Sequence, residues 1–119
     1  MTLASLEARL IAATGPDREI DALLQRAFLT PNTVVHVGCA GETNAFTKSI
    51  DAIGALIRRS GWHWGVNSVG EAVVYETATR DVPRYVAHCP TPELALCLTY
   101  VRAMRAKGEA EIVSKRPCE

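Results

Sequence analysis

The sequence predicts an α+β domain in which a three-stranded antiparallel meander lies between two helices, in the order α-β-β-β-α, with two additional N-terminal helices. The hydrophobic period changes from helical to alternating at Trp62 and becomes helical again after a Thr-Pro pair at 91–92. Breaks at Gly70 and at 81–83 divide the alternating stretch into three strands. The chain has 119 residues, of which 48% are hydrophobic. This is enough for one core, so a single domain over 1–119 is expected.

Two short helices are expected in the first part of the chain. An apolar stripe at helical spacing predicts a first helix that ends near Thr14, where Gly15 follows. Pro16 in the first turn begins a second helix, which the Thr-Pro-Asn run at 30–32 closes. Neither helix could bury its stripe alone, so 1–30 is expected to be a helical arm of the same domain. The two stripes consist of Leu3, Leu6, Leu10, Ala13, Ile20, Leu23, Leu24 and Ala27.

A valine-rich run at 33–38 and a polar, glycine-containing loop at 38–44 follow this arm. The run is either a short strand or a buried connection. After the loop, apolar residues at helical spacing predict a helix over 46–60. Thr47 is expected to be its N-cap, and Gly61 is expected to terminate it.

From Trp62 onward the alternating pattern places Trp62 and Trp64 on one strand face. Together with Tyr75 they could form a platform for stacked bases, but we expect the tryptophans to be the core wall against which the helices pack. A Thr-Pro-Glu start then predicts a helix over 91–107 that Gly108 stops.

The helices at 46–60 and 91–107 are expected to pack on one face of the meander, so that 46–107 forms the core unit. The N-terminal helices are a candidate cover for the other face, which would give a three-layer sandwich. The tail at 109–119 is either a frayed end or an added edge strand. Polar residues are expected on the second sheet face: His63, Asn67, Glu76, Arg84 and His88.

Charge and hydropathy argue against several function classes. The 13 basic and 13 acidic side chains cancel, which removes the broad positive field that non-specific nucleic-acid binding uses. The first residues lack the basic start and apolar run of a signal peptide, and no apolar stretch reaches membrane-spanning length. We therefore expect a cytoplasmic protein with no membrane partner, and nucleic acid is a disfavoured partner.

Cysteines and histidines give a weak metal or thiol signal. His36 and Cys39 lie close together in the sequence, and His88 adjoins Cys89, but neighbouring residues on a strand point to opposite faces. The cysteines include no CxxC pair, so buried or bystander thiols are expected. The sequence has no P-loop, GxSxG, HExxH or GxGxxG motif, and we expect neither a cofactor nor a catalytic site.

The polar loop and the cationic ends of the core helices form the candidate partner-binding surface. A loop of this length is costly unless it has a use. The arginines could meet an acidic partner, although each also complements a helix dipole. A protein partner is expected, and its identity and the oligomeric state stay open. The candidate residues are Glu42, Asn44, Arg58, Arg59, Arg102 and Arg105.

Three segments share the plan of a known group of proteins. They are an aromatic-Thr-x-Ser-hydrophobic-Asp helix start at 46–53, a Trp-containing strand at 61–64 and an Ala/Leu-rich helix opened by Thr-Pro at 91–97. In these segments the chain resembles the phage ABA-sandwich domain group, a set of small prophage-encoded proteins. The segment at 15–21 resembles the region that often precedes that core, so the similarity covers most of the chain. The long loop at 38–44 departs from the group's plan.

The resemblance implies a small phage or prophage accessory protein in the cytoplasm of the bacterial host, and the group carries no established activity to transfer. The leading expectation is a non-enzymatic protein that binds a macromolecule, and an inhibitor of host defence, such as an anti-CRISPR protein, is one concrete form of it. A nucleic-acid-binding module is the first alternative, because the α-β-β-β-α order matches double-stranded RNA-binding domains. Glu93 disfavours it by placing a carboxylate where such domains need cations. An uncharacterised enzyme is the least favoured alternative.

Overall fold

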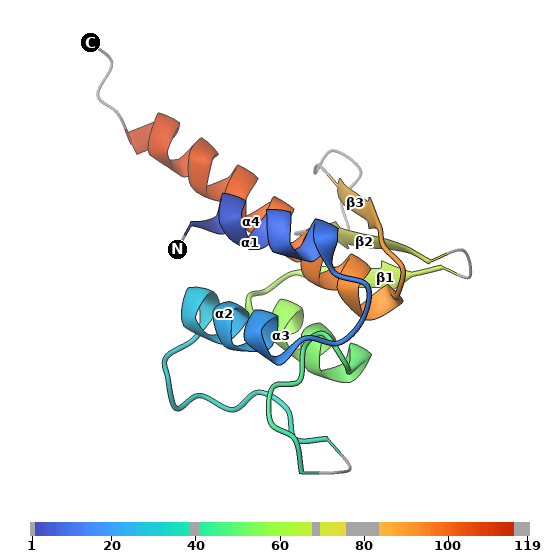
Figure 1. Ribbon diagram of the computed structural model, residues 1–119. Helices are drawn as coiled ribbons and strands as arrows, with labels where there is room; N and C mark the ends of the chain where they lie inside the picture. Colours follow the sequence, from blue (N-terminus) through green and yellow to red (C-terminus); the bar gives the residue numbers. More distant parts are fainter. Residues whose placement is uncertain (1, 39–40, 68–69, 76–83, 116–119) are drawn as a thin grey trace.

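The computed structural model describes residues 2–38, 41–67, 70–75 and 84–115 (Figure 1). Within these residues, four helices and three strands confirm the predicted α+β class and the α-β-β-β-α order after two N-terminal helices. The elements are α1 (Leu3–Ala12), α2 (Arg18–Phe28), α3 (Ile50–Arg59), β1 (His63–Val66), β2 (Glu71–Tyr75), β3 (Arg84–His88) and α4 (Pro92–Lys115).

The strands form one antiparallel sheet in the order β1-β2-β3, which is the predicted meander. Trp64, Val74 and Tyr85 lie side by side across it, and all three belong to the core or pack against it. Helix α3 contacts β1, and α4 contacts all three strands. The predicted packing of these two helices against one face of the sheet is therefore confirmed (Figure 1).

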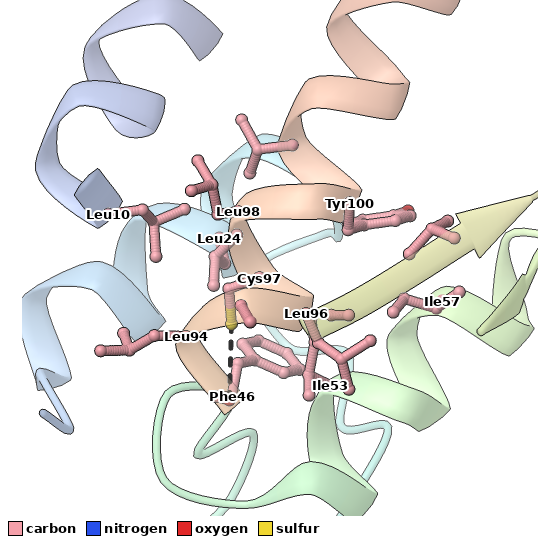
Figure 2. Close-up of a cluster of buried hydrophobic side chains, with 14 of the residues drawn as sticks. Leu10, Leu24, Phe46, Ile53, Ile57, Leu94, Leu96, Cys97, Leu98 and Tyr100 are labelled. Atoms are coloured by element: carbon pink, nitrogen blue, oxygen red, sulfur yellow. Dashed lines mark hydrogen bonds between the residues drawn. The ribbon is translucent and has the colours of Figure 1, made fainter. Parts of the chain in front are cut away.

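Helix α4 lies at the centre of the molecule. It contacts the sheet on one side and α1 and α3 on others. Every residue from Leu94 to Val101 is buried, and Figure 2 shows their side chains reaching neighbours in several directions. The buried residues of this part of α4 are therefore not confined to one side of the helix. A helix that is apolar on all sides is buried on all sides.

Of the N-terminal helices, α1 packs on α4, α2 packs on α1 and reaches α4 through the ring contact between Phe28 and Tyr100, and neither packs on the described part of the sheet. Helix α1 contacts α4 and α2, and no strand contacts α1 or α2 in the described part of the chain. The candidate cover of the second sheet face by these helices is therefore not found, because α4 has a further apolar side to bury.

The second sheet face is mixed: it carries polar residues and also Val86, which is 48% exposed. His63, Asn67 and His88 are exposed on it. Glu76 and the side chain of Arg84 lie outside the described residues.

The start of α3 differs from its predicted position. Ser49, not Thr47, is the N-cap, and its side-chain oxygen accepts from the backbone N–H of Ala52 at 3.3 Å. Thr47 is instead buried and bonded to Asp21 of α2. At the other end Gly61, with φ of 84°, follows the last turn as predicted, because a left-handed residue suits this position.

The C-terminal helix is longer than the sequence predicts. Helix α4 continues through Gly108 to Lys115, so the predicted stop is wrong and 109–115 is helical rather than a frayed tail or an edge strand. Glycine inside a helix costs about 1 kcal/mol relative to alanine, but it ends a helix only where the backbone turns left-handed. Residues 116–119 lie outside the described part.

Residues 31–38 and 41–49, named the α2–α3 loop from here on, contain little regular structure. The strand considered for 33–38 is reduced to one isolated antiparallel bridge between Val37 and Thr43. The loop is therefore an irregular segment whose shape depends on side-chain hydrogen bonds.

The first helix is also shorter than the sequence predicts, because α1 ends at Ala12 rather than near Thr14.

Both tryptophans lie on the helix side of the sheet, as predicted. Trp62 is 4% exposed, with its ring 6.1 Å from that of Tyr85 and 5.5 Å from the ammonium of Lys107. Trp64 is partly buried against α3. Tyr75 stacks on His63, which is paired with it across the sheet, and lies on the opposite face from Trp64. The three aromatic residues therefore do not form one stacking platform.

Candidate binding surface

Asn44 fixes the shape of the α2–α3 loop. It is 8% exposed and has φ of 49°, a left-handed conformation that asparagine tolerates better than most residues. Its side-chain oxygen accepts from the backbone N–H of Val35 at 2.9 Å and of His36 at 3.3 Å. Its amide nitrogen donates to the carbonyl oxygen of Thr33 at 2.8 Å and to the side-chain oxygen of Gln25. All four bonding positions of the amide are used, so the two halves of the loop are joined.

A second buried contact joins the loop to α2. Asp21 is 4% exposed, and one of its carboxylate oxygens accepts from both the backbone N–H and the hydroxyl of Thr47, each at 2.8 Å. Its other oxygen accepts from Arg18 at 3.0 Å. The backbone N–H of Asp17 donates to the Thr47 hydroxyl at 2.8 Å. A buried carboxylate that is bonded on both oxygens holds its neighbours in place.

The tip of the loop is closed by backbone and charge contacts. The backbone N–H of Gly38 donates to the carbonyl oxygen of Glu42 at 2.8 Å, and the backbone N–H of Asn44 donates to the carbonyl oxygen of His36 at 3.0 Å. The Glu42 carboxylate accepts from the Lys48 ammonium at 2.7 Å. This hydrogen bond and the charge of Lys48 hold the pKa of Glu42 below its ordinary value of 4.5.

Two valines of this loop are exposed beside hollows. Val34 is 53% exposed at the edge of a hollow of about 360 Å³ that also reaches Arg18. Val37 is 58% exposed at the edge of another of about 350 Å³, whose lining includes Lys48 and Asp51. Single exposed valines are common on protein surfaces. These two share one loop with a fixed backbone, which is the arrangement a partner can bind without first ordering it.

The candidate surface is defined by Val37, Glu42, Lys48 and Asp51, which line the same hollow, whereas Val34 lines the other one. Asp51 is exposed in the first turn of α3 and has no ion-pair partner among the described residues. Beside Val37 the carboxylates of Glu42 and Asp51 therefore face the single ammonium of Lys48. These three side chains together carry one net negative charge, and the charge of Arg18, which pairs with Asp21, also acts on Glu42.

The six residues predicted for the partner surface do not form one group. Glu42 lies on the candidate surface, whereas Asn44 is buried and its side chain is bonded within the loop and to Gln25 of α2. Arg102 and Arg105 of α4 both bind Glu7 of α1, at 3.1 and 2.8 Å. Their charges join two helices and are already balanced in part. Arg58 and Arg59 are exposed at the C-terminal end of α3.

The described cysteines are unsuited to chemistry at this surface. Complete burial raises the pKa of the Cys97 thiol well above its ordinary value, and its sulfur lies 3.5 Å from the carbonyl oxygen of Phe46, to which it donates (Figure 2). Burial likewise raises the pKa of Cys89. A protonated, enclosed thiol is a poor nucleophile and a poor metal ligand. Cys39 and Cys118 lie outside the described residues.

No family model, curated protein or solved structure matches this chain. Within the described residues, no group of His, Cys, Asp and Glu side chains could hold a metal ion. No described helix combines the length and apolar character needed to cross a bilayer. Inference about function therefore rests on the geometry of the candidate surface.

Sequence reasoning missed Val34, Val37, Lys48 and Asp51 as surface residues. The valines were assigned to a strand or a buried connection, because β-branched runs are usually half buried. Their exposure follows from Asn44, whose side chain takes the backbone N–H groups that a neighbouring strand would otherwise bind. The available signal was Asn44, which follows the valine run, but asparagine near glycine is also typical of a polar loop.

Proposed function

We propose that this chain is a small non-enzymatic protein that acts by binding another protein through the candidate surface. One observation carries the proposal: the α2–α3 loop exposes Val34 and Val37 while buried side chains hold its backbone. A preorganised loop loses little entropy when a partner binds, so a modest contact area can still give useful affinity. Long loops without regular structure are commonly retained for such a role.

Crosslinking from defined positions tests the proposal. A photoreactive amino acid is placed at position 37, and in a matched protein at position 11, because Val37 is 58% and Ile11 is 57% exposed. Both proteins are activated in the same bacterial lysate. We expect a discrete protein adduct from position 37 that is absent from position 11.

Competition identifies a specific adduct. Excess unlabelled wild-type chain should suppress the adduct. The Val37→Asp variant should need at least about a tenfold higher concentration for the same suppression, since a buried carboxylate opposes an apolar contact. Ile11→Asp is the control and should compete like the wild type. Equal adducts from both positions, or equal competition by both variants, would contradict a binding role for this surface.

The setting of this activity belongs to the same proposal and is supported by the resemblance to the phage ABA-sandwich domain group. In that setting the bound protein belongs to the bacterial host, and an inhibitor of CRISPR defence is one concrete form. Expression of the chain in a bacterium that clears a phage by CRISPR should then restore plaques. The Val37→Asp variant should lose this effect at equal protein level. Unchanged plaque counts with the wild-type chain would remove the CRISPR form and leave the binding role to the crosslinking test.

A further inference from the structure

The outer edge of the α2–α3 loop carries backbone groups without a partner. Val37 and Thr43 face each other in an antiparallel bridge, but the hydrogen bonds lie one residue to either side. The backbone N–H of Asn44 donates to the carbonyl oxygen of His36, and that of Gly38 donates to the carbonyl oxygen of Glu42. In an antiparallel pair of this kind, the central residues direct their N–H and C=O groups away from each other. Neither backbone group of Val37 has a hydrogen-bond partner in the described part of the chain.

The surroundings of this edge suit an added strand. The side chain of Val37 is 58% exposed beside it, and the hollow next to Val37 is about 350 Å³. An edge with free backbone groups is a template for pairing with another chain, and pockets beside it select the side chains of that chain. The edge is short, so the added segment must gain much of its affinity from side chains.

Charge identifies the chemistry of those side chains. Glu42 and Asp51 line the hollow with Lys48, and Lys48 already pairs with Glu42 at 2.7 Å. Asp51 is left as an exposed carboxylate at the first turn of α3. A lysine or arginine brought beside it would gain a charge partner, whereas an acidic residue would be repelled.

We propose that the outer edge at Val37 receives an extended, basic segment of a partner protein as an added strand, with a lysine or arginine of that segment at Asp51. This inference rests on the proposed function and specifies its partner. It differs from the sequence-based expectation of an acidic partner, because Arg102 and Arg105 are bound to Glu7 and the exposed carboxylate lies at the loop.

Selection from a library of random linear peptides on the full chain tests the proposal. Enriched peptides are expected to alternate valine or isoleucine with lysine or arginine. Asp51→Asn should weaken such a peptide about tenfold or more, and Glu71→Gln, which removes an exposed carboxylate from β2, should leave its affinity unchanged. Methylation of the peptide's backbone nitrogens should also abolish binding, because it removes the donors that pair a strand.

The following outcomes would each overturn the inference. Enriched peptides that are acidic, that tolerate backbone methylation, or that ignore Asp51→Asn exclude a basic added strand. Concentration-dependent dimers that Val37→Asp abolishes would assign the edge to a second copy, and a gel shift with nucleic acid that depends on Asp51 or Val37 would assign it to another class of partner. If crosslinking from position 37 succeeds while the peptide results fail, only this inference is lost. If both fail, the proposed function is lost as well.

Discussion

At the scale of single residues, Asn44 matters most for the candidate surface. Its side chain replaces the hydrogen bonds that a neighbouring strand would make, so Val34 and Val37 can remain exposed on an ordered backbone. Its left-handed φ of 49° would be strained in most other residues. Two separate properties therefore select this amino acid, and substitutions can distinguish them.

Asn44→Ala should lower the free energy of unfolding by about 2–4 kcal/mol, because it leaves buried polar groups unpaired and places alanine at positive φ. Asn44→Gly removes the same hydrogen bonds without the backbone strain, so it should cost about 1 kcal/mol less. Urea denaturation measures both values. Asn32→Ala, at an exposed position of the same loop, is the control. Equal stability of Asn44→Ala and wild type would show that the side-chain bonds do not hold the loop.

Residue-level prediction from sequence failed where a tertiary contact decided between two suitable residues. Thr47 and Ser49 are both good N-caps, and local rules favour neither strongly. Asp21, far away in sequence, binds Thr47 and leaves Ser49 to cap α3. Asn44 was assigned to a partner surface for a similar reason: asparagine in a loop is usually exposed, and only the fold brings Gln25 to it.

At the scale of elements, α3 and β1 meet through a glycine and a tryptophan. A Cβ atom at Gly54 would lie 2.6 Å from Cζ2 of the Trp64 ring, closer than two carbon atoms can pack. The glycine therefore lets the helix approach the sheet closely. Helix propensity alone would favour alanine by about 1 kcal/mol, so steric contact and propensity predict opposite signs.

Gly54→Ala should destabilise the protein by about 1–3 kcal/mol, since the indole must move to admit the methyl group. Thermal unfolding followed by tryptophan fluorescence measures the change. Trp64→Ala removes the obstacle, so the same substitution should cost less in that background. Gly15→Ala, where a Cβ would meet nothing within 4 Å, is the matched control and should be near neutral. A higher melting temperature for Gly54→Ala would show that the ring gives way freely.

The contact between α1 and α4 includes a partly enclosed ion pair. Glu7 is 17% exposed and binds both Arg102 and Arg105. Burial alone would raise the pKa of Glu7, but hydrogen bonds from Arg105 and Arg102, together with their charges, outweigh it and hold the pKa below 4.5. A carboxyl with a depressed folded-state pKa adds stability above its unfolded pKa, and this stability is lost as the pH falls through the folded value.

Glu7→Gln should therefore cost about 0.5–1 kcal/mol near pH 7, and its difference from wild type should shrink as the pH falls below 4.5 and through the lowered pKa. Denaturant unfolding over that pH range measures the difference. Glu19→Gln breaks the more exposed pair with Arg9, in which Glu19 is 77% exposed, and should change stability by only a few tenths of a kcal/mol. A Glu7→Gln deficit that does not depend on pH would mean that the ion pair is not its cause.

The boundaries of helices and strands were predictable from sequence where a local signal such as a left-handed glycine sets them, and not where other contacts or helix propensity decide. Gly61 and Gly70 both have positive φ in the turns that the sequence assigned to them. The end of α4 was wrong because Gly108 was treated as a stop, although good helix formers follow it. Every residue from Leu94 to Val101 is buried, which marks a central helix, and helical spacing of apolar residues alone does not predict that position.

At the scale of the whole molecule, α4 separates the sheet from α1. The order is therefore sheet, α4 and then α1, and α2 packs on α1 (Figure 1). Such an arrangement makes α1 and α2 part of the core, because α4 would otherwise expose an apolar side to water. The sequence indicated that 1–30 could not fold alone, but not which apolar face it covers, since both the sheet and α4 were available. The candidate surface was predictable only as a loop, since its exposed valines follow from long-range contacts.

Leu10→Ala should destabilise the entire domain and not α1 alone. Leu10 is 0% exposed against the core, and truncation of a buried leucine costs about 2–5 kcal/mol. Trp62 and Trp64 lie on the far side of α4, so their fluorescence reports unfolding at the sheet. If the layers unfold together, the fluorescence and far-ultraviolet circular dichroism transitions should shift equally to lower urea. Ile11→Ala, one residue away and 57% exposed, should leave both transitions in place. A fluorescence midpoint that stays at its wild-type value while the dichroism midpoint falls would show that the N-terminal helices unfold independently of the sheet and α4.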